Sequence, residues 1–339
     1  MLYKRLSPSE YRMLLAIPYS LTYSEVARRS RLSLSYVNVK VKELSQNVKV
    51  RFWADYRAMG LSPTYLLAEY EDRAYRLMAS RAIPFVKRIL KVWGWDGAYL
   101  LISACPPLGF ERRFAYYLPL RIKEIWVKEW EAKWIPSEGG LTKYVDGRIE
   151  VAWEKLHSTA SQPRFKWGIR TPVKVDWLDL MIIREKEEYA YARLSSVARK
   201  VKASQQLVSY HYRRHVRSLW IANYLEPLLT MKSNLLVLYR LEAIDASYSL
   251  SLLYALSQIP WLIDAFTLQG EERIVIAFLA VPQEQLVKFH SAMVSLEGVL
   301  KAELLAYIDP ASGIHYGFTA HLGFERGSWS LETLESWNP

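Results

Sequence analysis

The chain has 339 residues, 51% of them hydrophobic, which is enough for two or more folded domains, and its single cysteine excludes an internal disulfide or a multi-thiolate zinc cluster. No uninterrupted apolar run reaches the roughly 18 residues of a membrane span and the start lacks a secretory signal, so a cytoplasmic protein without membrane contact is expected. The net charge is +11 although residues 233–339 carry 5 basic and 12 acidic groups, and this asymmetry predicts a polyanion partner unless it is only the charged surface of a thermophile.

Three short helices are predicted near the N-terminus. Ser7 and Glu10 form a capping-box pattern that begins the first helix. A second helix is predicted over residues 22–30 and a third over 33–46, with Leu34 in its buried stripe. This order predicts a helix-turn-helix, although a helical bundle with a solvated basic face has the same pattern. The side chains expected to contact DNA are Arg28, Arg29, Arg31, Ser35, Tyr36, Asn38, Lys40 and Lys42.

A module of strands and helices follows. Its predicted elements are a strand at Thr64–Glu71, a helix at Tyr75–Val92 interrupted by Pro84, a strand at Ala98–Ala104, a helix at Gly109–Leu118 and a strand at Lys123–Lys133. A hairpin is predicted around Asp146-Gly147, and residues 155–172 are expected to form an exposed basic linker.

Residues 197–215 repeat residues 26–44 at an offset of 171. Both stretches begin Val-Ala-Arg followed by a basic residue, and a serine lies seven residues after the valine, at Ser33 and Ser204. A second three-helix segment is therefore predicted over residues 176–220. The DNA-facing side chains expected in this copy are Arg199, Lys200, Lys202, Gln205, Gln206, Ser209, Tyr210, Arg213, Arg214 and Arg217.

Two histidines of this copy, His211 and His215, are four residues apart on the third helix. That spacing can hold a metal ion, but the sequence shows no third ligand. A packing or phosphate-contact role is therefore expected, and no metal or other cofactor is predicted. Cys105 lies on a predicted buried strand, so an inert thiol is expected and no catalytic residue is assigned.

The strand and helix module also occurs twice. Its second copy is predicted as a strand at Leu235–Ala243, a helix at Ala246–Ile259, a hairpin of Leu262–Gln269 with Arg273–Ala280, a helix at Pro282–Ser295 and a strand at Leu300–Ile308. This β-α-β-β-α-β order is ferredoxin-like. In the C-terminal extension, Trp329 and Trp337 are expected to dock on a sheet edge or a partner.

The element order, together with the passage Val48–Glu71 and its Met59-Gly60-Leu61 corner, resembles the leucine-responsive/AsnC family of feast-famine regulators. The expected fold is α+β, with two helix-turn-helix domains alternating with two ferredoxin-like domains. The expected domain boundaries are 1–58, 59–135, 136–172, 173–232, 233–310 and 311–339. The resemblance implies double-stranded DNA as partner and an amino-acid-like effector. The 13 Trp and 23 Tyr residues favour large sheet interfaces and further assembly into homo-oligomers.

We therefore expect a sequence-specific DNA-binding transcription regulator that acts as an intramolecular pseudo-dimer and is not an enzyme. One alternative is an architectural, chromatin-like DNA-binding protein with little sequence preference. A lesser alternative is an enzyme like siroheme decarboxylase on the same fold, because some relatives of this family decarboxylate siroheme with paired units. The candidate residues for that alternative are His290, His315 and His321.

Overall fold

The computed structural model describes residues 5–46, 48–162, 171–227 and 234–335 of a mixed α/β protein. The chain divides into two compact units. Unit 1 comprises Met1–Arg51, Glu129–Trp167 and Ala222–Ile308. Unit 2 comprises Phe52–Lys128, Gly168–Ile221 and Asp309–Pro339. Each unit thus joins the helices of one copy of the repeat to the sheet of the other copy. Among the described residues, no helix combines the length and the apolar character needed to cross a bilayer.

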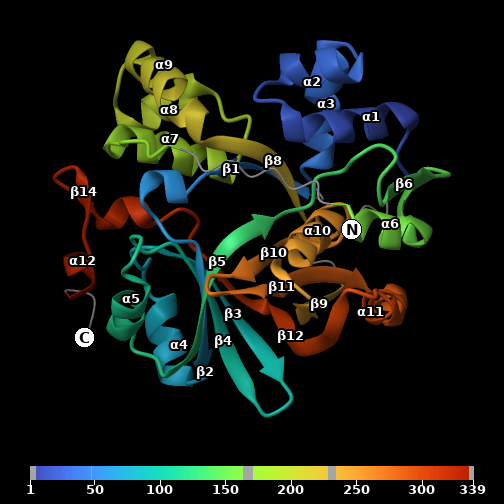
Figure 1. The fold of residues 1–339 in the computed structure, drawn as a ribbon. Helices are drawn as coiled ribbons and strands as arrows, with labels where there is room; N and C mark the ends of the chain where they lie inside the picture. Colours follow the sequence, from blue (N-terminus) through green and yellow to red (C-terminus); the bar gives the residue numbers. More distant parts are fainter. Residues whose placement is uncertain (1–4, 47, 163–170, 228–233, 336–339) are drawn as a thin grey trace. The chain divides into compact units, whose positions relative to one another are not determined.

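Unit 1 begins with α1 (Pro8–Ala16), α2 (Tyr23–Ser30) and α3 (Leu34–Leu44), shown in blue in Figure 1. The predicted capping box is confirmed, because Ser7 accepts from the Glu10 amide and the Glu10 carboxylate accepts from the Ser7 amide. The prediction that Leu34 is buried is wrong: its side chain is 46% exposed. Leu34 is the first residue of α3, ahead of the turns that pack inward.

The sheet of unit 1 is antiparallel, with the order β10-β11-β9-β12. Its strands are β9 (Asn234–Ala243), β10 (Leu262–Leu268), β11 (Glu271–Pro282) and β12 (Val299–His315), the last of which ends in unit 2. Helix α10 (Ala246–Ser257) packs on β9, β10 and β11. Helix α11 (Leu286–Val294) places Phe289 against Tyr239, with ring centroids 5.1 Å apart. The sequence pattern therefore predicted all six elements of this copy.

A hairpin and a short helix complete unit 1. Strands β6 (Thr142–Val145) and β7 (Arg148–Val151) form the predicted hairpin, and Tyr144 stacks on Tyr11 at 4.8 Å between ring centroids. The expectation of an exposed linker is wrong for its first part, because α6 (Leu156–Ala160) buries two apolar side chains against α10. Residues 161–162 and 171–172 of that segment are exposed, and residues 163–170 lie outside the described residues.

In unit 2 the sheet order is β3-β4-β2-β5, again antiparallel. Its strands are β2 (Thr64–Glu69), β3 (Val86–Gly94), β4 (Ala98–Ala104) and β5 (Ile122–Ala132), the last of which ends in unit 1. Helices α4 (Asp72–Ala79) and α5 (Glu111–Tyr117) lie beside this sheet (Figure 1). They bury Met78 and Phe114, both 0% exposed.

The predicted helix at Tyr75–Val92 is wrong in its second half, where the chain forms β3. Pro84 disfavours a helical conformation at the residue before it, and Phe85 has a left-handed φ of 67°. After this break, residues Val86–Gly94 form β3, which pairs with β4. The apolar spacing of this segment is compatible with a helix or a strand, and pairing with a distant part of the chain makes it a strand.

The three helices of unit 2 are α7 (Trp177–Glu188), α8 (Leu194–Val201) and α9 (Gln205–Arg214). The repeat extends to conformation, because Arg31 after α2 and Lys202 after α8 have left-handed φ values of 56° and 55°. The sequence predicts a third helix that reaches about Trp220, but α9 ends at Arg214. After a short 3-10 helix at Val216–Leu219 the chain enters β8 (Trp220–Pro227), which pairs with β1 (Val48–Ala54).

The C-terminal segment of unit 2 contains a 3-10 helix (Ala320–Gly323), β13 (Phe324–Glu325), β14 (Ser328–Trp329) and α12 (Glu332–Glu335). Trp329 docks within unit 2, but not on a sheet edge or a partner as predicted: its Nε1 donates at 2.7 Å to the carbonyl of Met59, which lies in the 3-10 helix Arg57–Met59. Trp337 lies outside the described residues.

Asn223 on β8 holds the helices of unit 1 to this strand. Its side chain is 0% exposed, and Nδ2 donates to the carbonyls of Ile17 and Ser20 at 3.3 and 2.5 Å. Asn223→Ala should lower the free energy of unfolding by roughly 1–3 kcal/mol, because buried carbonyls lose their donor. The exposed Gln283→Ala should change it by less than about 0.5 kcal/mol. Urea denaturation of both variants checks this, and equal effects would contradict it.

Candidate functional site

The side chains predicted to contact DNA lie on the described helical segments of both units, and most are exposed. Two of the lysines take part in ion pairs. Lys40 Nζ lies 2.8 Å from a Glu43 oxygen and 3.4 Å from a Glu10 oxygen. Lys200 pairs with Glu185. The positions of these side chains do not test whether they contact DNA, so that assignment stays a prediction.

Helix α7 carries an unusual number of buried ionisable side chains. Asp179 is 0% exposed, Lys186 is 5% exposed and Glu187 is 7% exposed. Charged groups removed from water require partners, and each of these three has them. The sequence pattern does not reveal the burial of these three side chains, because an ionisable residue in an amphipathic pattern is normally assigned to the solvent face.

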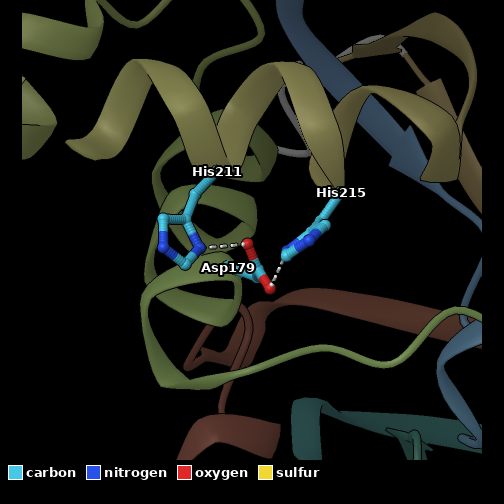
Figure 2. Close-up of side chains that lie close together, drawn as sticks. All are labelled: Asp179, His211 and His215. Carbon is cyan, nitrogen blue, oxygen red and sulfur yellow. Dashed lines mark hydrogen bonds and ion pairs between the residues drawn. The ribbon is translucent and has the colours of Figure 1, made fainter. Parts of the chain in front are cut away.

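Asp179 lies between two histidines of α9 and its C-terminal cap (Figure 2). His211 Nδ1 is 3.0 Å from Asp179 Oδ1, and His215 Nδ1 is 2.9 Å from Asp179 Oδ2. The carboxylate also completes the capping box of α7, because Oδ2 accepts from the Asp176 amide at 3.0 Å. The predicted packing role of the histidines is thus only part of their environment, and Asp179 is the third ligand-type residue that the sequence did not reveal.

Lys186 closes the C-terminal end of α7. Its Nζ donates to the carbonyls of Ala190 and Ala192 at 3.1 and 2.8 Å and lies 5.1 Å from the centre of the Tyr212 ring. Burial lowers the pKa of Lys186 to about 8. These contacts explain a buried cation in structural terms.

Glu187 links α7 to the sheet of unit 2. Its carboxylate accepts from the Tyr56 hydroxyl and from Lys87 Nζ, the latter at 3.0 Å, and Lys87 also bonds the Tyr56 hydroxyl. Phe318 of the C-terminal segment stacks on the Tyr56 ring with a centroid distance of 6.1 Å. The hydrogen bonds from Glu187 and Lys87 therefore fix the Tyr56 ring on which Phe318 stacks.

His321 continues that stack and meets α7. Its ring is 6.3 Å from that of Phe318, and its Nδ1 donates to the Phe318 carbonyl at 3.0 Å. This bond places the proton of a neutral ring on Nδ1 and leaves Nε2, which is 3.4 Å from Arg184 Nη1, as an acceptor. Burial lowers the pKa of His321 below 6.5, and the Arg184 charge lowers it further.

The three histidines considered for an enzyme do not form one group within a unit. His290 belongs to α11 in unit 1, where its ring is 6.0 Å from that of Tyr239. His315 and His321 belong to unit 2, and His315 Nε2 lies 4.0 Å from a Glu188 oxygen. His321 has the cationic side chain of Arg184 beside it, which can bind an anion. The sequence did not indicate that Arg184 lies beside His321, because the two residues are 137 positions apart along the chain.

Comparisons with known proteins show the fold. No protein-family model matches the chain, and no curated protein matches it. Among solved structures, it is similar to the crystal structure of the siroheme decarboxylase NirDL, with a TM-score of 0.50 and 10% identity over 88% of this chain and 90% of that one. A second structure of NirDL, in co-complex with an iron-uroporphyrin III analogue, gives a TM-score of 0.44 and 9% identity over the same shares.

This likeness corrects the functional expectation. The sequence predicted a DNA-binding regulator without enzymatic activity, with an architectural DNA-binding protein as its first alternative. The solved structure that the chain resembles at a TM-score of 0.50 is that of an enzyme, a siroheme decarboxylase. Three short helices with a basic face therefore did not identify the function, because the same local pattern belongs to a fold that also supports catalysis.

The lowered pKa of His321 predicts a pH dependence of stability. As the pH falls below 6.5, the unfolded chain takes up this proton before the folded chain does. The stability contribution of His321 is therefore complete above pH 6.5 and is lost as the pH falls through the folded-state pKa. His321→Gln should show a smaller fall in the free energy of unfolding between about pH 7.5 and about pH 5 than the wild type.

Urea titrations at several pH values measure this difference. His157→Gln, at an exposed position of α6, is the matched control and should retain the wild-type dependence. An undiminished pH dependence in His321→Gln would contradict the burial of this imidazole beside Arg184.

Proposed function

We propose that this chain is an enzyme that removes CO2 from a carboxylate side chain of an iron tetrapyrrole of the siroheme kind. The observation that carries the proposal is the similarity of fold to siroheme decarboxylase NirDL over 88% of this chain. The tetrapyrrole is the substrate and not a resident cofactor. The Arg184 and His321 pair of unit 2 supports the proposal with chemistry that the fold alone does not supply.

The proposal includes a finer description of the fold. We assign each three-helix segment as a helix-turn-helix and each sheet with its helices as a ferredoxin-like module, as in the leucine-responsive/AsnC family. The strand orders support this assignment, because β9 pairs with both β11 and β12 and β2 pairs with both β4 and β5. The first strand of each module is thus paired with the third and the fourth, which is the ferredoxin-like order.

Arg184 is suited to hold the anionic substrate. It is exposed on α7, and a guanidinium can donate two parallel hydrogen bonds to one carboxylate. Binding of a carboxylate here would offset the positive charge that lowers the pKa of His321. The incoming anion would therefore favour protonation of Nε2, which becomes the proton donor beside the bound group.

Decarboxylation needs such a donor. The bond between the side-chain carbon and the carboxylate carbon breaks, CO2 leaves, and the electron pair stays on the side-chain carbon, where the conjugated ring can delocalise it. A proton from His321 Nε2 then forms the new C–H bond, and the histidine regains a proton from solvent. General acids of this kind accelerate reactions by about 10²–10⁴-fold.

The network of Glu187, Lys87 and Tyr56 has a positioning role in this proposal. It fixes the Tyr56 ring, Phe318 stacks on that ring, and His321 stacks on Phe318. The orientation of the imidazole is thus determined by buried contacts and does not depend on the substrate. A preoriented donor loses less entropy when the substrate binds.

The test is an anaerobic incubation of the full chain with siroheme, followed by mass spectrometry of the tetrapyrrole. The wild type should convert siroheme to products that lack CO2. His321→Asn should lower kcat by about 10²–10⁴-fold, and Arg184→Gln should mainly raise KM. His157→Asn, which changes an exposed histidine outside the site, should keep wild-type activity.

Siroheme binding is followed separately by the visible absorbance of the bound tetrapyrrole. If siroheme binds and no CO2 is lost, the proposed activity is wrong. If the wild type is active and His321→Asn is equally active, the activity stands and the proton-donor role of His321 is wrong.

A further inference from the structure

We propose that Asp179, His211 and His215 of unit 2 bind a divalent transition-metal ion, Zn²⁺ or a late first-row neighbour. The three residues offer one carboxylate oxygen and two imidazole nitrogens, and these ligand atoms all lie within 4.8 Å of one another. The proposal concerns a site separate from the Arg184 and His321 pair. It does not depend on the decarboxylase activity.

Two helices bring the ligands together. Asp179 is in the first turn of α7, while His211 lies on α9 and His215 caps it. The four-residue spacing places both imidazoles on one face, with ring centroids 5.5 Å apart and ring planes at 87° (Figure 2). Both Nδ1 atoms point at the carboxylate, one at each oxygen. Asp179 is thus the third ligand, which the sequence around the two histidines did not reveal.

The distances suit a small ion after a slight expansion. Zinc binds histidine nitrogen at about 2.0–2.1 Å and carboxylate oxygen at about 2.0–2.2 Å, so two ligand atoms on one tetrahedral ion are about 3.4 Å apart. The contacts from His211 and His215 to Asp179 are 3.0 and 2.9 Å. If the histidine nitrogens and the carboxylate oxygens move apart by a few tenths of an ångström and the Nδ1 protons are lost, a metal ion fits between them.

The surroundings leave room for a fourth ligand. The side chains of His211 and His215 are 13% and 31% exposed, so water can reach the site. The half-exposed Asp176 has an oxygen 3.4 Å from His211 Nδ1 and is the nearest additional carboxylate. Asp179 is oriented by the Asp176 amide, and bonds of this kind to a ligand strengthen metal sites.

The donor set selects among metals. Ca²⁺ and Mg²⁺ prefer sites built from oxygen atoms. Imidazole suits zinc, copper, nickel and iron, and a site without thiolates is a poor one for Cu(I). Two histidines and one carboxylate with a position for water therefore favour Zn²⁺ among the abundant ions.

The first copy of the repeat shows what is distinctive here. Glu10 occupies the same capping-box position in α1 as Asp179 occupies in α7. Its partner is Lys40, which lies 171 residues before His211 and contributes a permanent positive charge. In the second copy the buried carboxylate meets two imidazoles, each of which can present a neutral lone pair to a cation. A bound divalent ion would provide the charge that Lys40 provides in the first copy.

The same contacts also form a hydrogen-bonded network without an ion, in which both Nδ1 atoms donate to the carboxylate. A metal site and a purely hydrogen-bonded cluster predict different affinities for Zn²⁺, and this affinity can be measured directly. The full chain, stripped with a chelator, is titrated with Zn²⁺ by calorimetry and with Co²⁺ by visible absorbance. We expect about one Zn²⁺ per chain and a Co²⁺ spectrum typical of a tetrahedral site with nitrogen and oxygen ligands.

The variants are His215→Gln, His211→Ala and Asp179→Asn, compared with His157→Ala as the control. Loss of one ligand should weaken Zn²⁺ binding by more than about 100-fold, the upper range for losing an outer-shell partner, and the control should bind as the wild type does. His215→Gln is the decisive variant because its partly exposed position least endangers folding, which circular dichroism verifies.

The affinity of the wild type should also fall as the pH is lowered, because protons compete for the imidazole nitrogens. If the wild type binds Zn²⁺ no more tightly than His215→Gln, the cluster is a hydrogen-bonded network and the proposal is wrong. If His157→Ala loses binding to the same extent, the metal lies elsewhere and the proposal is equally wrong. Neither result bears on siroheme decarboxylation, so the two proposals fail independently.

Discussion

The need to compensate buried carboxylates on α7 is the constraint on which unit 2 depends. Asp179 and Glu187 are almost entirely removed from water, where an unpartnered charge would be very costly. Near the N-terminal end of the helix, Asp179 is bonded by imidazoles of α9 and its cap. At the other end, Glu187 is bonded by groups from the sheet side of the unit. Helix α7 is thereby held at both ends, and Arg184 lies between them.

The two copies of the repeat use one scaffold for different chemistry. Both open with a helix that is capped by a capping box, and both end their second helix with a basic residue in the left-handed conformation. Glu10 and Asp179 hold equivalent positions, but one meets the ammonium of Lys40 and the other meets two histidines. An ammonium can only neutralise the carboxylate, whereas imidazoles can also bind a metal or move a proton.

The correction of the functional assignment has a physical basis. Basic residues on the outer face of short helices are compatible with DNA, with an acidic tetrapyrrole and with plain solvation, because all three present the same exposed cations. Arg184 and His321, which are 137 residues apart, become neighbours only in the folded chain, and a local sequence pattern cannot reveal such a pair. The fold itself is similar to that of a siroheme decarboxylase.

The sequence by itself determined the duplication, the helix caps, the hairpins and most elements of both sheets, because capping boxes and hydrophobic periodicity act over a few residues. It also contained the His211 and His215 pair. Only the tertiary structure decided that residues 86–94 pair as a strand, that each unit combines parts of both copies, and that Asp179 completes the histidine cluster. These outcomes depend on contacts between segments far apart in the chain, where burial and strand pairing outweigh local preference.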